Sequence, residues 1–163
     1  MRNVCEGSLM EIELPPDFKE FFRSLNAKRV KYLLIGGYAV ILNGYSRNTS
    51  DLDISIASDA ENAGRFIEAL AEFGFSAPDL TPEHFSGTTK HVLRMGVEPV
   101  KIEILNYLEG VNFEQAYGRR VQKRIEDIQI DVIEINDLIA NKISVGRLQD
   151  LTDVEKLRER NDI

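Results

Sequence analysis

Cysteine is nearly absent from this sequence, and so are long apolar runs. A single residue, Cys5, excludes an internal disulfide framework and a cysteine-based zinc site. The apolar runs, such as Tyr32 to Ile35, are far too short to cross a membrane. Because the first residues include Arg2 and Glu6 and lack an apolar stretch, no signal peptide is expected. We therefore predict a cytoplasmic protein in a reducing setting, with no membrane association.

Positive charge is also in short supply. The chain has 20 lysines and arginines against 27 aspartates and glutamates, a net charge of −7. This balance disfavours a protein that coats nucleic acid, although it leaves room for a local basic groove. With 163 residues, 43% hydrophobic and 29% charged, the composition is that of an ordinary globular protein. We predict an N-terminal extension over 1–14 and one domain over 15–163.

Hydrophobic periodicity predicts an α+β fold. Pro15 and Pro16 are typical of a helix start, and Phe18, Phe21, Phe22 and Leu25 then form one apolar face. Ser58 to Glu61 has the pattern of a capping box ahead of another helix. The expected strands cover 31–35, 52–57, 91–95, 100–105, 121–125 and 128–133, and further helices cover 38–42, 113–117, 137–145 and a segment from about 150. The sequence thus predicts a mixed sheet flanked by helices, with a helical pair at the C-terminus and mostly loop over 76–88.

Two glycines and two aspartates carry the strongest functional signal. Asp51 and Asp53 alternate with aliphatic residues in a predicted strand, so both carboxylates project from one face, roughly 7 Å apart. Such carboxylates repel each other unless a cation lies between them, and oxygen ligands suit Mg²⁺ or Mn²⁺. Gly36-Gly37, between a strand and a helix, lets backbone N–H groups approach a phosphate. Each pair alone is more often a tight turn or a cap, but the two in this order predict a metal–nucleotide site.

The order Ile35-Gly36-Gly37, thirteen residues, then Asp51-Leu52-Asp53-Ile54 resembles the nucleotidyltransferase superfamily that includes DNA polymerase beta. The spacer is at the long end of that pattern. The resemblance implies a third carboxylate on a neighbouring strand, and the segment 101–105 offers Glu103 where the family more often has Asp. It further implies two Mg²⁺ (or Mn²⁺) ions held by Asp51, Asp53 and Glu103, and an NTP substrate cradled by the glycines.

The stretches YLLIGGYAVILNGYSRNTSDLDI and DLIANKISVGRLQDLTDVEKL extend the resemblance over about 18–158, to small prokaryotic nucleotidyltransferases related to abortive-infection and toxin-type proteins. It implies that Arg47, Thr49 and Lys142 bind the nucleotide and that a tail aspartate belongs to the catalytic site. Asp150 is favoured over Asp153 for that role. The structural alternatives are a surface arginine, a lysine with a solvated head group, and aspartates that cap a helix.

The expected function is metal-dependent transfer of an NMP group from an NTP to an unidentified acceptor. The acceptor could be an RNA such as a tRNA end, a protein hydroxyl, or a small molecule such as an aminoglycoside or lincosamide. The alternative is a non-catalytic or antitoxin-like partner in a two-gene toxin–antitoxin pair.

A basic segment stands apart from this motif. Arg119, Arg120, Lys123 and Arg124 fall within six positions beside or within the predicted hairpin. They could bind RNA or a protein partner, but charges that protect an exposed strand edge are the commoner reason for such a pattern.

Overall fold

The computed structural model describes residues 12–97 and 99–163. Most of the predicted N-terminal extension, including Cys5, lies outside the described residues. Leu14 at its end is buried, so the hydrophobic core already begins before the first described helix. The helices are α2 (Pro16–Ala27), α3 (Gly36–Leu42), α4 (Ala60–Phe73), α5 (Phe113–Gly118), α6 (Ile135–Val145) and α7 (Leu148–Asn161), with a short 3₁₀ helix at Pro82–His84.

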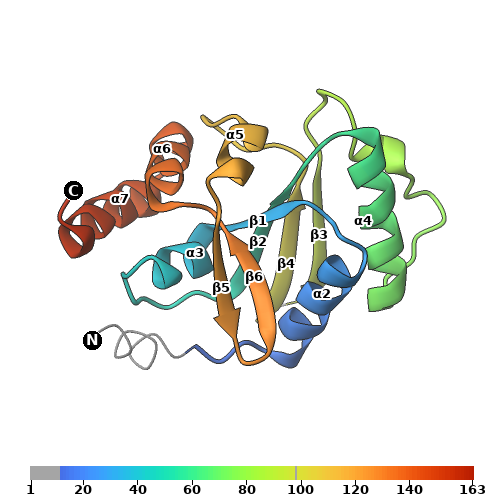
Figure 1. Ribbon diagram of the computed structural model, residues 1–163, viewed down its shortest axis with the longest axis horizontal. Coiled ribbons are helices and arrows are strands. Elements are labelled where there is room, and N and C mark those ends of the chain that lie inside the picture. Colours follow the sequence, from blue (N-terminus) through green and yellow to red (C-terminus); the bar gives the residue numbers. More distant parts are fainter. Residues whose placement is uncertain (1–11, 98) are drawn as a thin grey trace.

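The strands form one mixed sheet (Figure 1). They are β1 (Tyr32–Ile35), β2 (Asp51–Ile56), β3 (Val92–Val97), β4 (Val100–Leu105), β5 (Val121–Ile125) and β6 (Ile128–Val132), and their spatial order is β3-β4-β2-β1-β6-β5. The β2–β4 and β1–β6 pairs are parallel, and the other neighbouring pairs are antiparallel. The predicted α+β class with a mixed sheet, including the hairpin near the C-terminal end, is confirmed.

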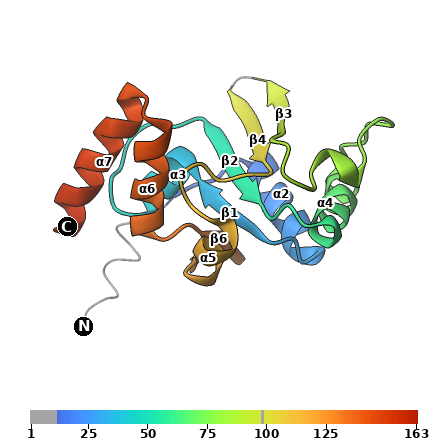
Figure 2. The same cartoon turned by 90° about the horizontal axis from the view of Figure 1, so that it is seen from above.

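Helices α2 and α4 pack against each other and bury the aromatic half of the core. The apolar face that the spacing predicts is present, since Phe18, Phe21, Phe22 and Leu25 are all buried in α2. Phe21 contacts Phe73 of α4 edge to face, with ring centroids 5.2 Å apart. Helices α6 and α7 lie together at the other end of the molecule from α4 (Figures 1 and 2). No helix within the described ranges is long and apolar enough to span a membrane.

The start of α4 differs from the sequence-based expectation. The residue that caps the helix is Asp59, whose carboxylate accepts the backbone N–H of Asn62, so the capping box predicted from Ser58 is wrong by one position. The reason is tertiary. The buried Asn62 side chain accepts from the Lys31 backbone N–H and donates to the carbonyls of Lys31 and Ala57, which fixes the first turn against β1.

The C-terminal helices begin two residues earlier than their sequence pattern suggests. Glu134 caps α6 by accepting the backbone N–H groups of Asn136 and Asp137. Helix α7 begins at Leu148, because Asp150 accepts from the backbone N–H of Arg147 and closes the first turn. The segment 76–88 is mostly irregular as expected, apart from the 3₁₀ turn at Pro82–His84.

Strand β1 passes into α3 without a loop, and Gly36 makes this possible. Its φ of +71° lies in the left-handed region, which side chains with a Cβ rarely adopt. A methyl group at this position would also collide with the Asp53 carboxylate and would lie 2.8 Å from the Asp53 Cβ. Gly36 therefore sets how closely the β1–α3 corner approaches the carboxylate of Asp53.

We expect Gly36→Ala to lower the free energy of unfolding by at least about 2 kcal/mol, because the backbone strain and the collision with Asp53 add. Chemical denaturation followed by circular dichroism measures the change. Gly64→Ala in α4 is the matched control, since an added Cβ there meets nothing within 4 Å. That control should raise stability by about 0.5–1 kcal/mol. Equal stability of the two variants would show that the corner can relax around a side chain.

Candidate functional site

A cleft of about 480 Å³ opens between the carboxylate-bearing face of the sheet and the C-terminal helices. Its walls come from the β1–α3 corner, from β2 and β4, from the segment after β4, and from α6 and the start of α7. The lining residues are Ile35, Gly36, Asp51, Asp53, Glu103, Leu105, Tyr107, Leu108, Glu109, Asn141, Lys142, Ser144, Val145, Arg147 and Asp150. Segments that are more than one hundred positions apart in the sequence therefore meet at one site.

The three predicted carboxylates project from one face of two adjacent parallel strands. Asp53 on β2 lies directly opposite Glu103 on β4, and Asp51 lies two positions earlier on β2. The intervening residues Leu52 and Ile54 are fully buried on the other face, which fixes the orientation of the strand. The sequence alternation of carboxylate and aliphatic residues is thus reproduced in space.

Asp53 is the electrostatically unusual member of this group. Burial, together with the nearby charges of Glu103 and Asp51, raises its pKa to about 7. Lys142 and Arg147 act in the opposite direction without cancelling the effect. At neutral pH the ionised carboxylate of Asp53 is therefore unfavourable in this structure, and a proton or a cation beside it relieves the cost.

The donor set has the chemistry that Mg²⁺ or Mn²⁺ prefers, since every candidate ligand is a carboxylate oxygen. Within residues 12–97 and 99–163, however, no group of three or more Asp, Glu, His or Cys side chains gathers closely enough to hold a metal ion as the side chains lie. One reason is visible: an oxygen of Glu103 lies 2.6 Å from Nε of Arg94. The three carboxylates have the ligand chemistry for a divalent ion, and the raised pKa of Asp53 favours a cation beside it, but Glu103 is paired with Arg94.

A chain of alternating charges runs from the cleft, through side chains of α6 and α7, to the loop before β2. The Lys142 side chain is only 5% exposed, and its Nζ lies 3.1 Å from Asp150 Oδ1 and 3.0 Å from Asp153 Oδ2. At one end of the chain, Arg147 pairs with Asp150 at 2.7 Å. At the other end, Arg47 holds both oxygens of Asp153 at 2.8 and 2.9 Å. This chain ties α6 and α7 to the loop that leads into β2.

The pKa values of the two aspartates in this chain show which effect dominates. Burial raises the pKa of Asp150, but hydrogen bonds from Arg147 and Lys142 outweigh it and hold the pKa below its usual range. In the same way, burial raises the pKa of Asp153, and hydrogen bonds from Arg47 and Lys142 bring it below its usual range. Both carboxylates are therefore ionised at neutral pH and pair with the surrounding cations.

Not all sequence-predicted site residues reach the cleft. Gly36, Lys142 and Asp150 join the three carboxylates in its lining, whereas Gly37, Arg47 and Thr49 do not. A Cβ on Gly37 would collide with the Thr49 hydroxyl, so this glycine permits close packing of the loop before β2. Because the guanidinium of Arg47 faces Asp153, it points to the charge chain rather than to the cleft. Of the two tail aspartates, Asp150 lines the cleft.

Sequence reasoning assigned no site role to several lining residues. Arg147 is the clearest example: the sequence shows it only as the residue after a helix-ending glycine, yet its side chain is 75% exposed at the cleft beside Asp150. Asn141 reaches across from α6 and donates to the Glu109 carbonyl at 2.9 Å. No local sequence pattern predicts that these residues line the cleft, because their positions depend on how α6 packs against the segment after β4.

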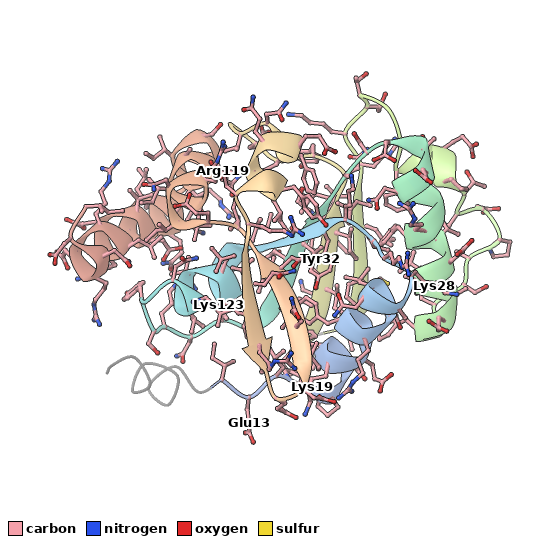
Figure 3. The ribbon with its side chains drawn as sticks, in the orientation of Figure 1. Glu13, Lys19, Lys28, Tyr32, Arg119 and Lys123 are labelled. Atoms are coloured by element: carbon pink, nitrogen blue, oxygen red, sulfur yellow. The ribbon has the colours of Figure 1, made fainter. Side chains whose placement is uncertain are left out.

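The basic segment near the hairpin is largely neutralised by its own surroundings. Arg119 forms two hydrogen bonds to Asp137, at 2.9 and 3.0 Å, and Arg120 lies 3.4 Å from an oxygen of Asp131. Figure 3 shows Arg119 near α6 and Lys123 well separated from it along β5. Arg119 and Arg120 already have acidic partners, and Lys123 lies apart from Arg119, which weakens the hypothesis of an RNA-binding ribbon.

Solved structures share this fold. A protein from Thermotoga maritima described as a nucleotidyltransferase has a TM-score of 0.58 at 19% identity, with 88% of this chain and 91% of that one covered. The lincosamide antibiotic adenylyltransferase LnuA, in a lincomycin-bound structure, has a TM-score of 0.53 at 17% identity, with coverage of 89% and 96%. The antibiotic-resistance factor ANT(2'')-Ia has a TM-score of 0.55 at 9% identity, with coverage of 88% and 81%.

At these identities the likeness shows the fold alone. A comparison with curated proteins gives no match. The family profile described as "Nucleotidyltransferase of unknown function (DUF6036)" matches residues 17–162, nearly the whole chain. The strand–Gly-Gly–helix corner, the carboxylate row and this match agree, and the chain belongs to the DUF6036 family of nucleotidyltransferases.

Proposed function

We propose that this protein transfers an NMP group from an NTP to a hydroxyl acceptor, and that the reaction takes place in the cleft. The observation that carries the proposal is the row formed by Asp53 and Glu103 on adjacent parallel strands, with Asp51 two positions away on the same face. The pKa of Asp53, raised to about 7 chiefly by burial, supports the proposal, because a positive charge beside this carboxylate would favour its ionised form. A binding protein without catalysis has no need for such a costly arrangement.

Asp51, Asp53 and Glu103 would hold the divalent ions. When bound, two Mg²⁺ ions lower the pKa of the acceptor hydroxyl and neutralise the charge on the leaving pyrophosphate. The chain itself forms no covalent intermediate in this scheme. Its residues bind the nucleotide, hold the carboxylates in one row and orient the acceptor, so positioning and electrostatics supply the catalysis.

The nucleotide side of the cleft is its positively charged wall. Gly36 lines the cleft, and because it lacks a Cβ its backbone lies directly against the Asp53 carboxylate, at the place where we expect the phosphates. Arg147 presents an exposed guanidinium whose fork matches phosphate oxygens, and Lys142 adds a charge below it. Asp150 contacts both cations, and we assign it the positioning of these side chains.

The acceptor remains defined only by its chemistry, a hydroxyl on RNA, on a protein or on a small molecule. LnuA and ANT(2'')-Ia share the fold and are named for antibiotic modification or resistance, which supports a small-molecule acceptor as one candidate. The intact carboxylate row favours an enzyme over a non-catalytic antitoxin-like partner, because loss of catalysis removes the pressure to keep three repelling carboxylates together.

The first prediction is that NTP binding requires a divalent metal. Titration calorimetry with ATP and GTP should show binding in Mg²⁺ and at least tenfold weaker binding in EDTA, since the carboxylates otherwise repel the triphosphate. The double variant Asp51→Asn/Asp53→Asn should lose the dependence on Mg²⁺. The matched control is Asp59→Asn, which changes a carboxylate outside the cleft and keeps the capping oxygen.

Activity is then sought with labelled NTPs, Mg²⁺, total RNA and cell lysate, and label transfer to any acceptor should disappear in the same double variant. Metal-independent NTP binding that the double variant leaves unchanged would refute the assignment of these carboxylates as the metal site.

A second prediction concerns the pH dependence of stability without metal. Because the pKa of Asp53 is raised to about 7, this group stabilises the fold below pH 4, and that contribution is lost as the pH rises through about 7. In EDTA at pH 8, Asp53→Asn should therefore be more stable than the wild type by about 2 kcal/mol. At pH 4 the difference should nearly vanish.

Thermal unfolding at both pH values measures the effect, and Asp79→Asn in an exposed loop is the control. Mg²⁺ should stabilise the wild type at pH 8 and have little effect on Asp53→Asn. A variant that is less stable than the wild type at pH 8 would show that Asp53 is needed as a charged structural group.

The third prediction separates the two roles of Lys142. Lys142→Met removes the cation between two buried aspartates, each of which keeps one arginine, so we expect a loss of about 2–4 kcal/mol. Because the pKa values of both aspartates are lowered, the stabilisation from their pairing is present above about pH 4 and is lost only as the pH falls through these lowered values, so the variant and the wild type should converge only in stronger acid.

NTP affinity is compared at a temperature where both proteins are folded. Lys156→Met on α7, an exposed lysine whose nearest acidic partner lies 3.8 Å away, is the control. Unchanged affinity in folded Lys142→Met would make this lysine purely structural.

A further inference from the structure

One basic residue on the edge strand lies in line with the carboxylate row. Arg94 of β3 is directly opposite Glu103 of β4, and Glu103 is directly opposite Asp53 of β2. The three side chains therefore form one row across three strands on the same face of the sheet. Arg94 donates from Nε to the Glu103 carboxylate at 2.6 Å, the shortest ion pair that the described residues form.

Within this row, Glu103 lies between Arg94 and Asp53. After burial, the charge of Glu103 contributes most to raising the pKa of Asp53, so the two carboxylates repel each other across the strands. The Glu103 side chain is 31% exposed, whereas Arg94 is 68% exposed. Because the arginine is on the solvent side, it can leave the pair without opening the core, while the carboxylate is held by its strand.

We propose that Arg94 is the resident counter-ion of Glu103 and competes with a divalent cation for this carboxylate. Without metal, the Arg94 guanidinium is paired with Glu103, the third carboxylate of the row. This pairing keeps Glu103 from binding an ion together with Asp51 and Asp53. To hold a divalent ion together with Asp51 and Asp53, Glu103 would have to leave Arg94, so site assembly would include an exchange of partners. This inference rests on the proposed function, because it concerns how that site forms its metal-binding set.

The surrounding charges make Arg94 the residue suited to this role. Arg147 and Lys142 are the cations that act on Asp53, and both are paired with aspartates of the C-terminal helices. Arg94 instead pairs with a member of the carboxylate row itself. It acts through Glu103 and is therefore a positioning residue.

The experiment is a double-mutant cycle on metal affinity. Mn²⁺ binding is measured by electron paramagnetic resonance and by calorimetry for the wild type, Arg94→Gln, Glu103→Gln and the double variant. Arg94→Gln should bind Mn²⁺ about three- to fivefold more tightly, the size expected when an exposed ion pair no longer competes. In the Glu103→Gln background the same change should have almost no effect, because the competition acts through that carboxylate.

Arg65→Gln on α4 is the charge-matched control, since that arginine pairs with Glu61 outside the cleft. If Arg94→Gln leaves affinity unchanged, or tightens it equally with and without Glu103, the exchange does not occur and the arginine acts only through its long-range field. These results would leave the proposed function standing as long as Asp51→Asn/Asp53→Asn abolishes Mn²⁺ binding. A wild type that binds no Mn²⁺, with or without NTP, would overturn both.

Discussion

The position of β2 between β1 and β4 is the constraint on which the rest of the site depends. Pairing with β1 places Asp53 against Gly36, and parallel pairing with β4 places Glu103 beside it. A shift of one residue in either register would turn the carboxylates into the core and expose the aliphatic residues between them. The burial of Leu52 and Ile54 therefore does more than stabilise the sheet, since it also fixes the row of charges.

Repulsion within this row is balanced by positive charge from two directions. From the C-terminal helices come Lys142 and Arg147, which are held in place by Asp150. From the edge of the sheet comes Arg94, which contacts Glu103 directly. The protein thus keeps three nearby carboxylates in a folded state without metal, and still leaves Asp53 with a pKa near 7. We expect a bound divalent ion to remove the remaining free-energy cost of ionising Asp53.

The family match and the structural neighbours agree on a nucleotidyltransferase fold. Because the sequence identities to these neighbours are low, the substrate has to be inferred from the residues of the cleft. We propose that Gly36, Arg147 and Lys142, which all line the cleft, form its nucleotide side. The acceptor side has no comparable signature among the described residues, so the hydroxyl that receives the NMP group must be identified by experiment. The buried charge chain shows that the C-terminal helices belong to the site, because they supply its cations and fix their positions.

The sequence by itself determined the α+β class, most elements and the pair of Asp51 and Asp53 on one strand face, because these depend on local periodicity and on residues close together in the chain. Glu103 joins the row only through the pairing of β2 with β4. Leu52 and Ile54 alternate with Asp51 and Asp53 in the sequence, and strand geometry turns that alternation into one polar and one apolar face. Only the tertiary structure decided which polar side chains meet. Arg47, expected at a phosphate, pairs with Asp153 on α7 more than one hundred residues away. Arg147 lines the cleft because α7 docks beside α6. The start of α4 differs from the sequence-based expectation because the Asn62 side chain is buried and bonded to Lys31, the residue before β1. The packing of segments that are distant in the sequence determines these contacts, so short-range sequence patterns do not predict them.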